Sequence, residues 1–166
     1  MKNDACVVQL VEKLSLDKEF VIRALDAFVA GLVEELLEKG EVPVRGLGCF
    51  KVVHIPSRKT VQGSVAKVYP PRRKVVFFTR SVIETSALRI LERKTSLSHA
   101  RCEQFYRILV RHFRKSHSKM QGLSMEGLGS FTKVDGKYIF VPDRTLEEIV
   151  NNAYDHLSVF EIEAGA

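Results

Sequence analysis

The sequence has 166 residues, 45% of them hydrophobic, and a formal net charge of +6, which allows one or two compact domains and favours an acidic partner. This composition excludes a disordered chain. No apolar run approaches the ~20 residues of a membrane-spanning helix. The polar start MKNDACVVQLVEKL is unlike a signal peptide. The cysteines (Cys6, Cys49 and Cys102) form no Cys-x-x-Cys pair, which argues against a disulfide framework or zinc ribbon and indicates the reducing cytoplasm.

Two helices are predicted at the start of the chain. Apolar residues recur with helical spacing over residues 5–14 and again over residues 18–39. Asp17 is a suitable cap for the second helix, and Gly40 is a normal stop at its end. The side chains expected to face inward are Ala5, Val8, Leu10, Val11 and Leu14 in the first helix and Phe20, Ala24, Phe28, Leu32, Leu36 and Leu37 in the second. So wide a face on the second helix predicts more than one neighbour.

A strand, a tight turn and a second strand are predicted next. Val42 and Val44 alternate with other residues, Gly46-Leu47-Gly48 permits a turn or bulge, and Phe50 to Val53 resume the strand pattern. A Gly-x-Gly pair also occurs in phosphate-binding loops. Here a third glycine, a Gly-Lys-Ser/Thr sequence and a following helix are missing, so the turn is favoured.

Residues 54–73 are predicted to form a protruding basic β-ribbon, which we call the arm. The stretch HIPSRKTVQGSVAKV has no apolar periodicity that would fill a core, and Gln62-Gly63 is its expected turn. Residues 74–78, KVVFF, return as a strand. Between Glu41 and Glu84 no residue is acidic and nine are basic. Such charges also discourage edge-to-edge aggregation, but that role alone does not explain the absence of acids over about forty residues.

The remainder of the chain is predicted to alternate helices and strands again. Ser81-x-x-Glu84 reads as a capping box that opens a helix over residues 82–94, and Ser98 starts a long helix. Strands follow to Val134, Asp135-Gly136 is a two-residue hairpin signal, and residues 138–141 return. The inward residues expected are Cys102, Phe105, Leu109 and Phe113 in the long helix and Leu146, Ile149, Val150 and Ala153 in a final helix capped by Asp143. The acidic segment after Tyr154 is expected to be frayed or lightly docked.

An internal repeat organises the chain. The stretch VPVRGLGCFKVV at residues 42–53 recurs as LSMEGLGSFTKV at residues 123–134, a shift of 81 positions. Phe78 matches Phe140 at a shift of 62, so the second copy is expected to be 19 residues shorter between its strands. This pattern predicts an α+β protein made of one duplicated unit. Residues 1–90 would form the first unit with the arm, residues 91–166 the second unit without one, and the helix over 82–94 would be shared.

Metal binding and catalysis are not favoured. His99 and Cys102 lie one helical turn apart, but they supply only two ligands, and His112 and His117 fit a solvated basic helix. No spacing typical of a Ser-His-Asp triad, a carboxylate pair or an activated cysteine is present. We expect neither an enzyme nor a cofactor.

The layout as a whole resembles the HU and integration host factor family of bacterial DNA-bending proteins. VPVRGLGCFKV is similar to the family's apolar-x-Gly-x-Gly-x-Phe strand, and FVPDRTLEEIVN at residues 140–151 is similar to its Phe-x-Pro-x-x-x-Leu-x-x-x-Val ending. The resemblance covers residues 2–153. It implies a helical base under a sheet saddle, with β-arms that reach round the DNA minor groove. It also implies that this chain joins both halves of the usual dimer, as a pseudodimer.

Three departures from the family pattern bear on the mechanism. The second copy has Asp135-Gly136 where an arm would grow, and the likely arm tip, residues 60–63, has no proline to wedge between base pairs. Arg80 stands where the second copy keeps Pro142. Wedge-type kinking is therefore not expected, although Val61 is an apolar candidate for it.

The sequence thus predicts an architectural protein of the cytoplasmic nucleoid that binds double-stranded DNA with little sequence preference. The expected DNA-binding residues are Arg45, Lys51, Arg58, Lys59, Val61, Lys67, Arg72, Arg73, Lys74, Arg80, Lys133 and Lys137. We expect no membrane partner and a monomeric pseudodimer, with a homodimer left open because duplicated units can also pair between chains. The alternative function is a protein-interaction scaffold that kept this fold but lost DNA binding.

Overall fold

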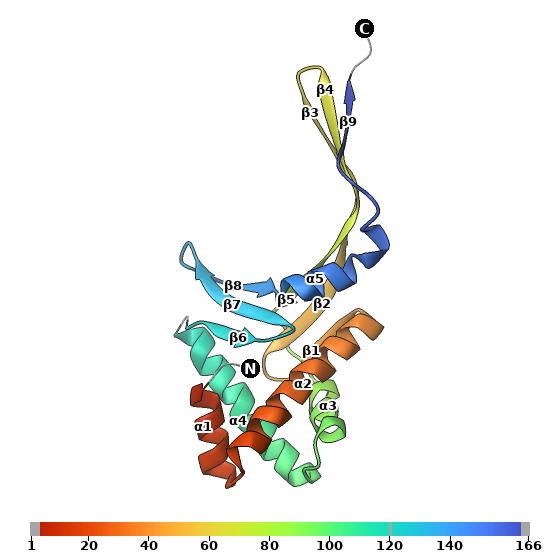
Figure 1. Ribbon diagram of the computed structural model, residues 1–166. Coiled ribbons are helices and arrows are strands. Elements are labelled where there is room, and N and C mark those ends of the chain that lie inside the picture. Colours follow the sequence, from red (N-terminus) through yellow and green to blue (C-terminus); the bar gives the residue numbers. More distant parts are fainter. Residues whose placement is uncertain (1–3, 120, 164–166) are drawn as a thin grey trace.

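The computed structural model describes residues 4–119 and 121–163, which form a body of helices and sheets from which one arm projects (Figure 1). The described helices are α1 (Asp4–Leu14), α2 (Lys18–Lys39), α3 (Ser86–Lys94), α4 (His99–Ser118) and α5 (Arg144–Val150), with a short 3-10 turn η1 (Asn152–Tyr154). The strands are β1 (Glu41–Val44), β2 (Gly48–Ile55), β3 (Arg58–Gln62), β4 (Val65–Tyr69), β5 (Arg72–Phe78), β6 (Leu123–Met125), β7 (Gly129–Val134), β8 (Lys137–Pro142) and β9 (Phe160–Glu163). The predicted α+β class is confirmed.

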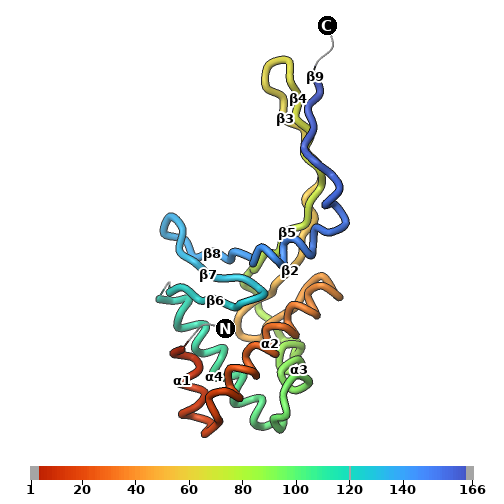
Figure 2. Tube along the Cα trace, viewed as in Figure 1, coloured from red at the N-terminus to blue at the C-terminus, as the bar shows by residue number. Residues whose placement is uncertain are grey.

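Three small antiparallel sheets share the strands. Their orders are β1-β2-β5, β6-β7-β8 and β3-β4-β9. The first two sheets lie side by side above α1 to α4, and the third forms the arm (Figures 1 and 2). Among the described residues, no helix is long and apolar enough to cross a bilayer.

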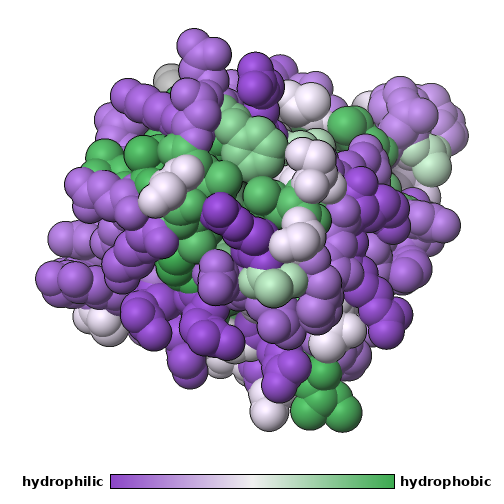
Figure 3. All heavy atoms as spheres, turned by 90° about the horizontal axis from the view of Figure 1, so that it is seen from below, coloured by the Kyte–Doolittle hydropathy of each residue, from purple (hydrophilic) through white to green (hydrophobic). Residues whose placement is uncertain are grey.

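The four helices below the sheets pack in a regular arrangement. The short helices α1 and α3 each contact both of the long helices α2 and α4. Seen from below, most of this surface is hydrophilic, with a hydrophobic area at the upper left and centre of the view and smaller ones towards its right and lower edges (Figure 3). Most apolar side chains of the helices are therefore turned inward, where they join a single core with the side chains of both sheets.

The ends and inward faces of α1 and α2 follow the sequence, except at three residues. The side chain of Asp17 accepts a hydrogen bond from the Phe20 amide at 3.1 Å, and Gly40 ends α2 with a φ of 78°. Ala5, Val8 and Leu37 were wrongly expected to face inward, because each is exposed. The buried stripe of α1 is instead Cys6, Val7, Leu10 and Leu14, since α1 packs against two helices from one side.

The capping box predicted before α3 does not form. The helix begins at Ser86, not at residue 82, and its first residue follows Thr85, whose side chain makes no capping hydrogen bond. The Glu84 carboxylate instead accepts from the Ile83 amide at 3.1 Å and from the Arg80 guanidinium at 3.3 Å. Residues 81–85 therefore form a connection between β5 and α3 that is not helical.

The two body sheets have the same strand register. Val42 pairs with Phe50 in the first sheet as Leu123 pairs with Phe131 in the second, which is the predicted shift of 81 positions. In both sheets a side chain on the second glycine of the turn, Gly48 or Gly129, would collide with a backbone carbonyl of the next strand.

The predicted match between Phe78 and Phe140 is wrong by one residue. Phe50 faces Phe77, and Phe131 faces Phe140. The return strands therefore match at a shift of 63, and the first copy is longer by 18 residues. By the same shift, the residue of the first copy that corresponds to Pro142 of the second is Thr79, rather than Arg80.

Aromatic rings connect the two sheets. The Phe131 ring lies 5.1 Å from Phe77, 6.3 Å from Phe50 and 4.9 Å from Phe113 of α4, and Phe50 lies 5.2 Å from Phe140. Pairs at such distances add to the hydrophobic free energy of burial. The halves of the chain thus share one aromatic cluster between the sheets and the helices.

The last described segment differs from its prediction. Leu146 and Val150 of α5 are buried as expected, but Ile149 is 48% exposed and Ala153 is exposed within η1. The helix ends at Val150, so the periodicity that predicted Ala153 as inward no longer applies there. The acidic segment expected to be frayed or lightly docked contains β9, which pairs with β4 of the arm.

Candidate nucleic-acid interface

The arm extends a ribbon that starts within the body. Ile55 pairs with Arg72 at the end of the β2-β5 pair, and Arg58 pairs with Tyr69 in the same register beyond it. Pro56, Pro70 and Pro71 lie at the junction, where they interrupt the ladder because proline has no amide hydrogen to donate. The turn after Gln62, predicted from Gln62-Gly63, closes the ribbon with Gly63 at a φ of 64°. The β3-β4 hairpin is therefore a long projection with a break at its base.

The cations of the arm occupy both of its faces. Strand alternation places Arg58 and Lys67 on one face, and Lys59 and Val61 on the other. The Arg58 guanidinium lies 4.5 Å from the centre of the Tyr69 ring, a cation–π contact that holds its stem on the ribbon. Val61, near the tip, is 67% exposed. The arm therefore presents positive charge on both sides and one bare apolar side chain.

Residues after α5 brace the base of the arm. The Asn151 side chain accepts from the Arg73 amide at 2.7 Å and donates to the Arg73 carbonyl at 2.8 Å. The same side chain donates to the Glu147 carbonyl at 2.9 Å, which ties it to α5. The Arg73 guanidinium lies 5.5 Å from the centre of the Tyr154 ring, and that ring also lies near His54. These contacts hold the outer edge of β5 where the arm begins.

The outer faces of the two body sheets, which we call the saddle, differ in the side chains that they carry. Strand alternation turns Phe50 and Phe77 towards the helices and Lys51 and Lys74 outward. In the second sheet the outward positions of the strands include Ile139 and Val141. The saddle is thus basic on the half that carries the arm and more apolar on the other.

The two lysines predicted in the second sheet lie on different faces. Lys137 points outward with Ile139, whereas Lys133 shares the face of Phe131, opposite to the saddle. The two side chains point in opposite directions because Lys133 is one residue away from Val134, the partner of Lys137, and a one-residue step along a strand reverses the direction of the side chain. The predicted contribution of both lysines to DNA binding stays a prediction.

The remaining predicted cations are exposed and lie at three different places on the molecule. Arg45 is in the β1-β2 turn, Arg72 and Arg73 flank the arm base, and Arg80 follows β5. Two of the predicted cations have an acidic partner among residues 4–119 and 121–163: Arg80 pairs with Glu84 at 3.3 Å, and Lys67 pairs with Glu161 of β9 at 3.5 Å.

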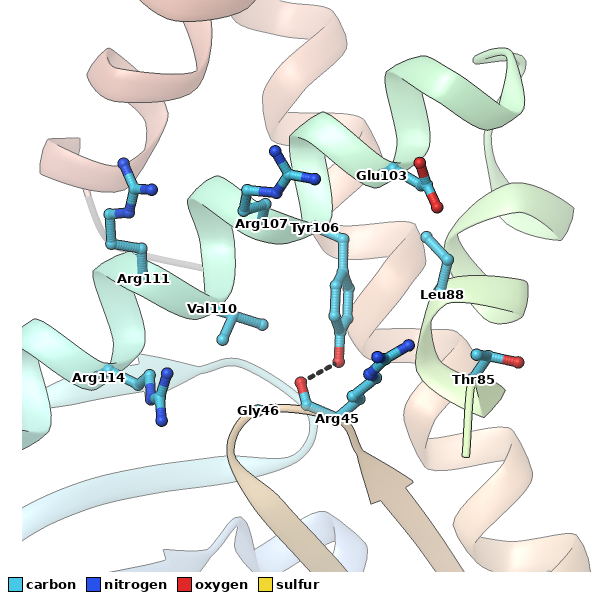
Figure 4. A pocket seen from close by; sticks show the side chains of 10 residues that line it. All are labelled: Arg45, Gly46, Thr85, Leu88, Glu103, Tyr106, Arg107, Val110, Arg111 and Arg114. Carbon is cyan, nitrogen blue, oxygen red and sulfur yellow. Dashed lines mark hydrogen bonds between the residues drawn. The ribbon is translucent and has the colours of Figure 1, made fainter. Parts of the chain in front are cut away.

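A groove beside α4 gathers arginines that the sequence prediction did not assign to the site. Arg107, Arg111 and Arg114 of α4 line it together with Arg45 of the β1-β2 turn, and its volume is about 540 Å³ (Figure 4). The three α4 arginines follow one helical stripe, at i, i+4 and i+7, which is the signal that could have identified them. We call it the arginine groove.

A tyrosine holds the two walls of the arginine groove together. The Tyr106 hydroxyl donates to the Arg45 carbonyl at 2.7 Å (Figure 4). Burial raises the pKa of Tyr106 above its ordinary value, so the hydroxyl keeps its proton and remains a donor. In the part of the chain that is described, none of the four groove arginines forms a salt bridge.

The histidines and cysteines considered as metal ligands have other contacts. His99 bonds to Glu92 through Nδ1 and lies 3.5 Å from Glu103 through Nε2. The Cys102 thiol is buried near Thr95 at 3.7 Å. Within the described ranges, no three His, Cys, Asp or Glu side chains are grouped to hold a metal ion.

A comparison with protein families agrees with this geometry. The model of the family described as "Bacterial DNA-binding protein" matches residues 1–86, from the N-terminal helices through the arm to the first residue of α3. Among curated proteins, no sequence match was found. The matched segment is half of the chain and contains the basic arm and its sheet, so the chain belongs to the bacterial DNA-binding protein family, the HU family.

Proposed function

We propose that this protein is an architectural component of the bacterial nucleoid that binds duplex DNA through the saddle and a single basic arm, with little sequence preference. The observation that carries the proposal is the arm itself. It projects from the body, its cations include Arg58 and Lys59, and it belongs to a segment without acidic residues between Glu41 and Glu84.

The chemistry of the arm favours recognition of the phosphate backbone. Each phosphate that a lysine or arginine neutralises releases condensed counterions, which provides affinity without reference to base sequence. An arginine inside a narrow minor groove responds to groove width more than to base identity. Arg58 and Lys59, on opposite faces of the ribbon, are placed to contact phosphates on either side of a groove. Little sequence preference follows.

Intercalation is a weaker element of the proposal. The arm tip carries no proline, and Val61 is its exposed apolar side chain. A valine side chain is smaller than the Phe, Leu, Ile or Met side chains that unstack base steps, and it lacks the rigid ring of a proline wedge. With one arm and a small wedge, we expect a shorter footprint and a smaller bend than a protein with two arms produces.

The arginine groove extends the proposed DNA path onto the side of the body. Arg107 and Arg114 are seven residues apart on α4, about 10 Å at 1.5 Å per residue. Arg45, on the opposite wall, adds a fourth positive charge, and the lining also contains one carboxylate, that of Glu103. We propose that the groove contacts the duplex beyond the saddle.

A salt titration of DNA affinity tests the function. If the protein neutralises five to eight phosphates, log K should fall against log salt with a slope of roughly −4 to −7. The double variant Arg58→Ala/Lys59→Ala should bind a random duplex more weakly and with a shallower slope. The matched control Lys13→Ala/Lys18→Ala removes the same charge from exposed positions on the helical base. Absence of duplex binding at low salt would favour the scaffold function instead.

We further propose that the chain is an intrachain pseudodimer. The shared register of the two body sheets, the reciprocal packing of α1 and α3 on both long helices and the single hydrophobic core support this arrangement. Each half alone would expose the apolar faces that now meet between α2 and α4.

Light scattering tests the pseudodimer. The full chain should be monomeric in solution, and a fragment of residues 1–90 should be unstable or form homodimers through its bared face. An obligate dimer of the full chain, together with a stable monomeric fragment, would contradict the proposal.

A further inference from the structure

The outer edge of the arm is occupied by an acidic strand of the same chain. Strand β9 runs antiparallel to β4, with Val65 opposite Glu163 and Val68 opposite Phe160 (Figures 1 and 2). Together with the Asn151 bonds to Arg73, residues 151–163 follow the same edge of the ribbon from the arm base towards its tip. The arm is thus three-stranded in this structure, whereas its own hairpin supplies only two strands.

The side chains of β9 match the two faces of the arm. Glu161 lies opposite Lys67 on the face that also carries Arg58, and their charged groups are 3.5 Å apart. On the other face, Ile162 lies opposite Ala66, which is 8% exposed although it is in a projecting arm. A slip of one residue would move the carboxylates to the apolar face and the apolar side chains to the charged one. Charge and apolarity therefore both specify this register.

This arrangement conflicts with entry of the arm into a DNA groove. Neighbouring strands lie about 4.8 Å apart, so three strands span roughly 10 Å of backbone. The minor groove of B-DNA is about 6 Å wide. In addition, Glu161 and Glu163 would approach phosphates with the same sign of charge. Two strands are compatible with the groove in width and in charge, and three are not.

We propose that β9 is a built-in competitor of DNA for the arm: it covers the edge of β4 and part of the arm's positive charge, and it must detach before the arm enters a groove. The inference rests on the proposed DNA-binding function and adds regulation to it. Glu161 takes the place of a phosphate beside Lys67, and the backbone of β9 satisfies an edge strand that would otherwise be open to pairing with other chains. Partners or conditions that release β9 would strengthen DNA binding.

Population arithmetic gives the size of the effect. If only about one molecule in ten has β9 detached, the apparent dissociation constant is raised about tenfold over that of the free arm. Removal of residues 158–166 should then strengthen duplex binding by roughly five- to tenfold at about 0.1 M salt. Because salt screens the ion pair between Lys67 and Glu161, the difference should narrow as the salt concentration rises.

Charge variants separate competition from a simple change in net charge. Glu161→Gln/Glu163→Gln should tighten duplex binding by about threefold or more, since it weakens docking without shortening the chain. The matched control Glu12→Gln/Glu19→Gln removes two exposed carboxylates from the helical base and should change affinity by less than about twofold. Equal effects of the two double variants would overturn the proposal.

A reversible crosslink tests whether detachment is required. Ala66 and Ile162 are direct cross-strand partners, so Ala66→Cys/Ile162→Cys places two thiols at a distance that a disulfide spans. The native cysteines are all buried in the body. The oxidised variant should bind duplex at least tenfold more weakly than the same protein after reduction. The single variant Ala66→Cys should bind duplex with the same affinity before and after treatment with the same oxidant.

Hydrogen exchange gives a second readout that does not depend on a variant. Amides of residues 160–163 should be protected in the free protein and should lose protection when duplex is added. Retained protection in the complex, or equal affinity of the oxidised and reduced crosslink variants, would overturn the inference while leaving DNA binding intact. If neither the full chain nor the shortened chain binds duplex at low salt, the proposed function itself fails.

Discussion

Replacement of Phe131 by alanine should destabilise the whole body in one step. The ring is 2% exposed and lies within 4.9 to 6.3 Å of the rings of Phe113, Phe77 and Phe50. Truncation of a buried phenylalanine costs about 3 to 5 kcal/mol, because its contacts are lost and a cavity remains. Total stabilities are about 5 to 15 kcal/mol, so a large part of the free energy of unfolding would be lost.

Urea unfolding measures this loss. Far-ultraviolet circular dichroism and tyrosine fluorescence should report one coincident transition, since Phe131 contacts side chains from both halves of the chain. A loss of 3 to 5 kcal/mol corresponds to a fall in melting temperature of roughly 6 to 20 °C for a chain of this size. The control Ile83→Ala, at a site 85% exposed, should change stability by no more than about 0.5 kcal/mol. A loss below about 1 kcal/mol, or two separate transitions, would refute the single shared core.

Three further outcomes are expected. Gly129→Ala should lower the free energy of unfolding by more than about 1 kcal/mol, because the new Cβ would collide with a carbonyl of β8. The control Gly122→Ala has space for a Cβ and should change stability little, and the urea midpoints of the two variants measure the difference. Burial lowers the pKa of His112, so as the pH falls the unfolded chain binds a proton at this imidazole before the folded chain does. The free energy of unfolding should therefore decrease as the pH drops below about 6.5. If a His112→Gln variant showed the same pH dependence of stability, it would contradict this. Asn151→Ala removes both bonds to the Arg73 backbone and should speed amide exchange at the arm base while leaving exchange in α2 unchanged.

Most features determined by local backbone chemistry were predicted from the sequence, although the capping box before α3 was not among them. Asp17 and Ser98 cap their helices, and Asp135-Gly136 makes a tight turn with positive φ at both residues. The repeated Gly-Leu-Gly-x-Phe strand also predicted the shared register of the two body sheets. Such features depend on residues within a few positions of one another, where few backbone conformations are allowed.

Features that depend on which surfaces meet were predicted less well. The apolar residues of α1 allow more than one inward face, and contact with both α2 and α4 selects the stripe that includes Cys6 and Val7 rather than Val8. The match of Phe78 to Phe140 failed by one residue because sequence similarity does not identify cross-strand partners, whereas backbone pairing does.

The sequence by itself determined the α+β class, the repeated Gly-Leu-Gly-x-Phe strand and the basic arm, because periodicity, turn residues and charge are properties of short segments. Only the tertiary structure decided that α4 and the β1-β2 turn form an arginine groove, and that the acidic strand β9 lies on the arm. Glu163 pairs with Val65 across nearly one hundred residues. A short alternating strand such as FEIE fits many sheet edges, and its partner is selected by which edge is open, within reach and complementary in charge.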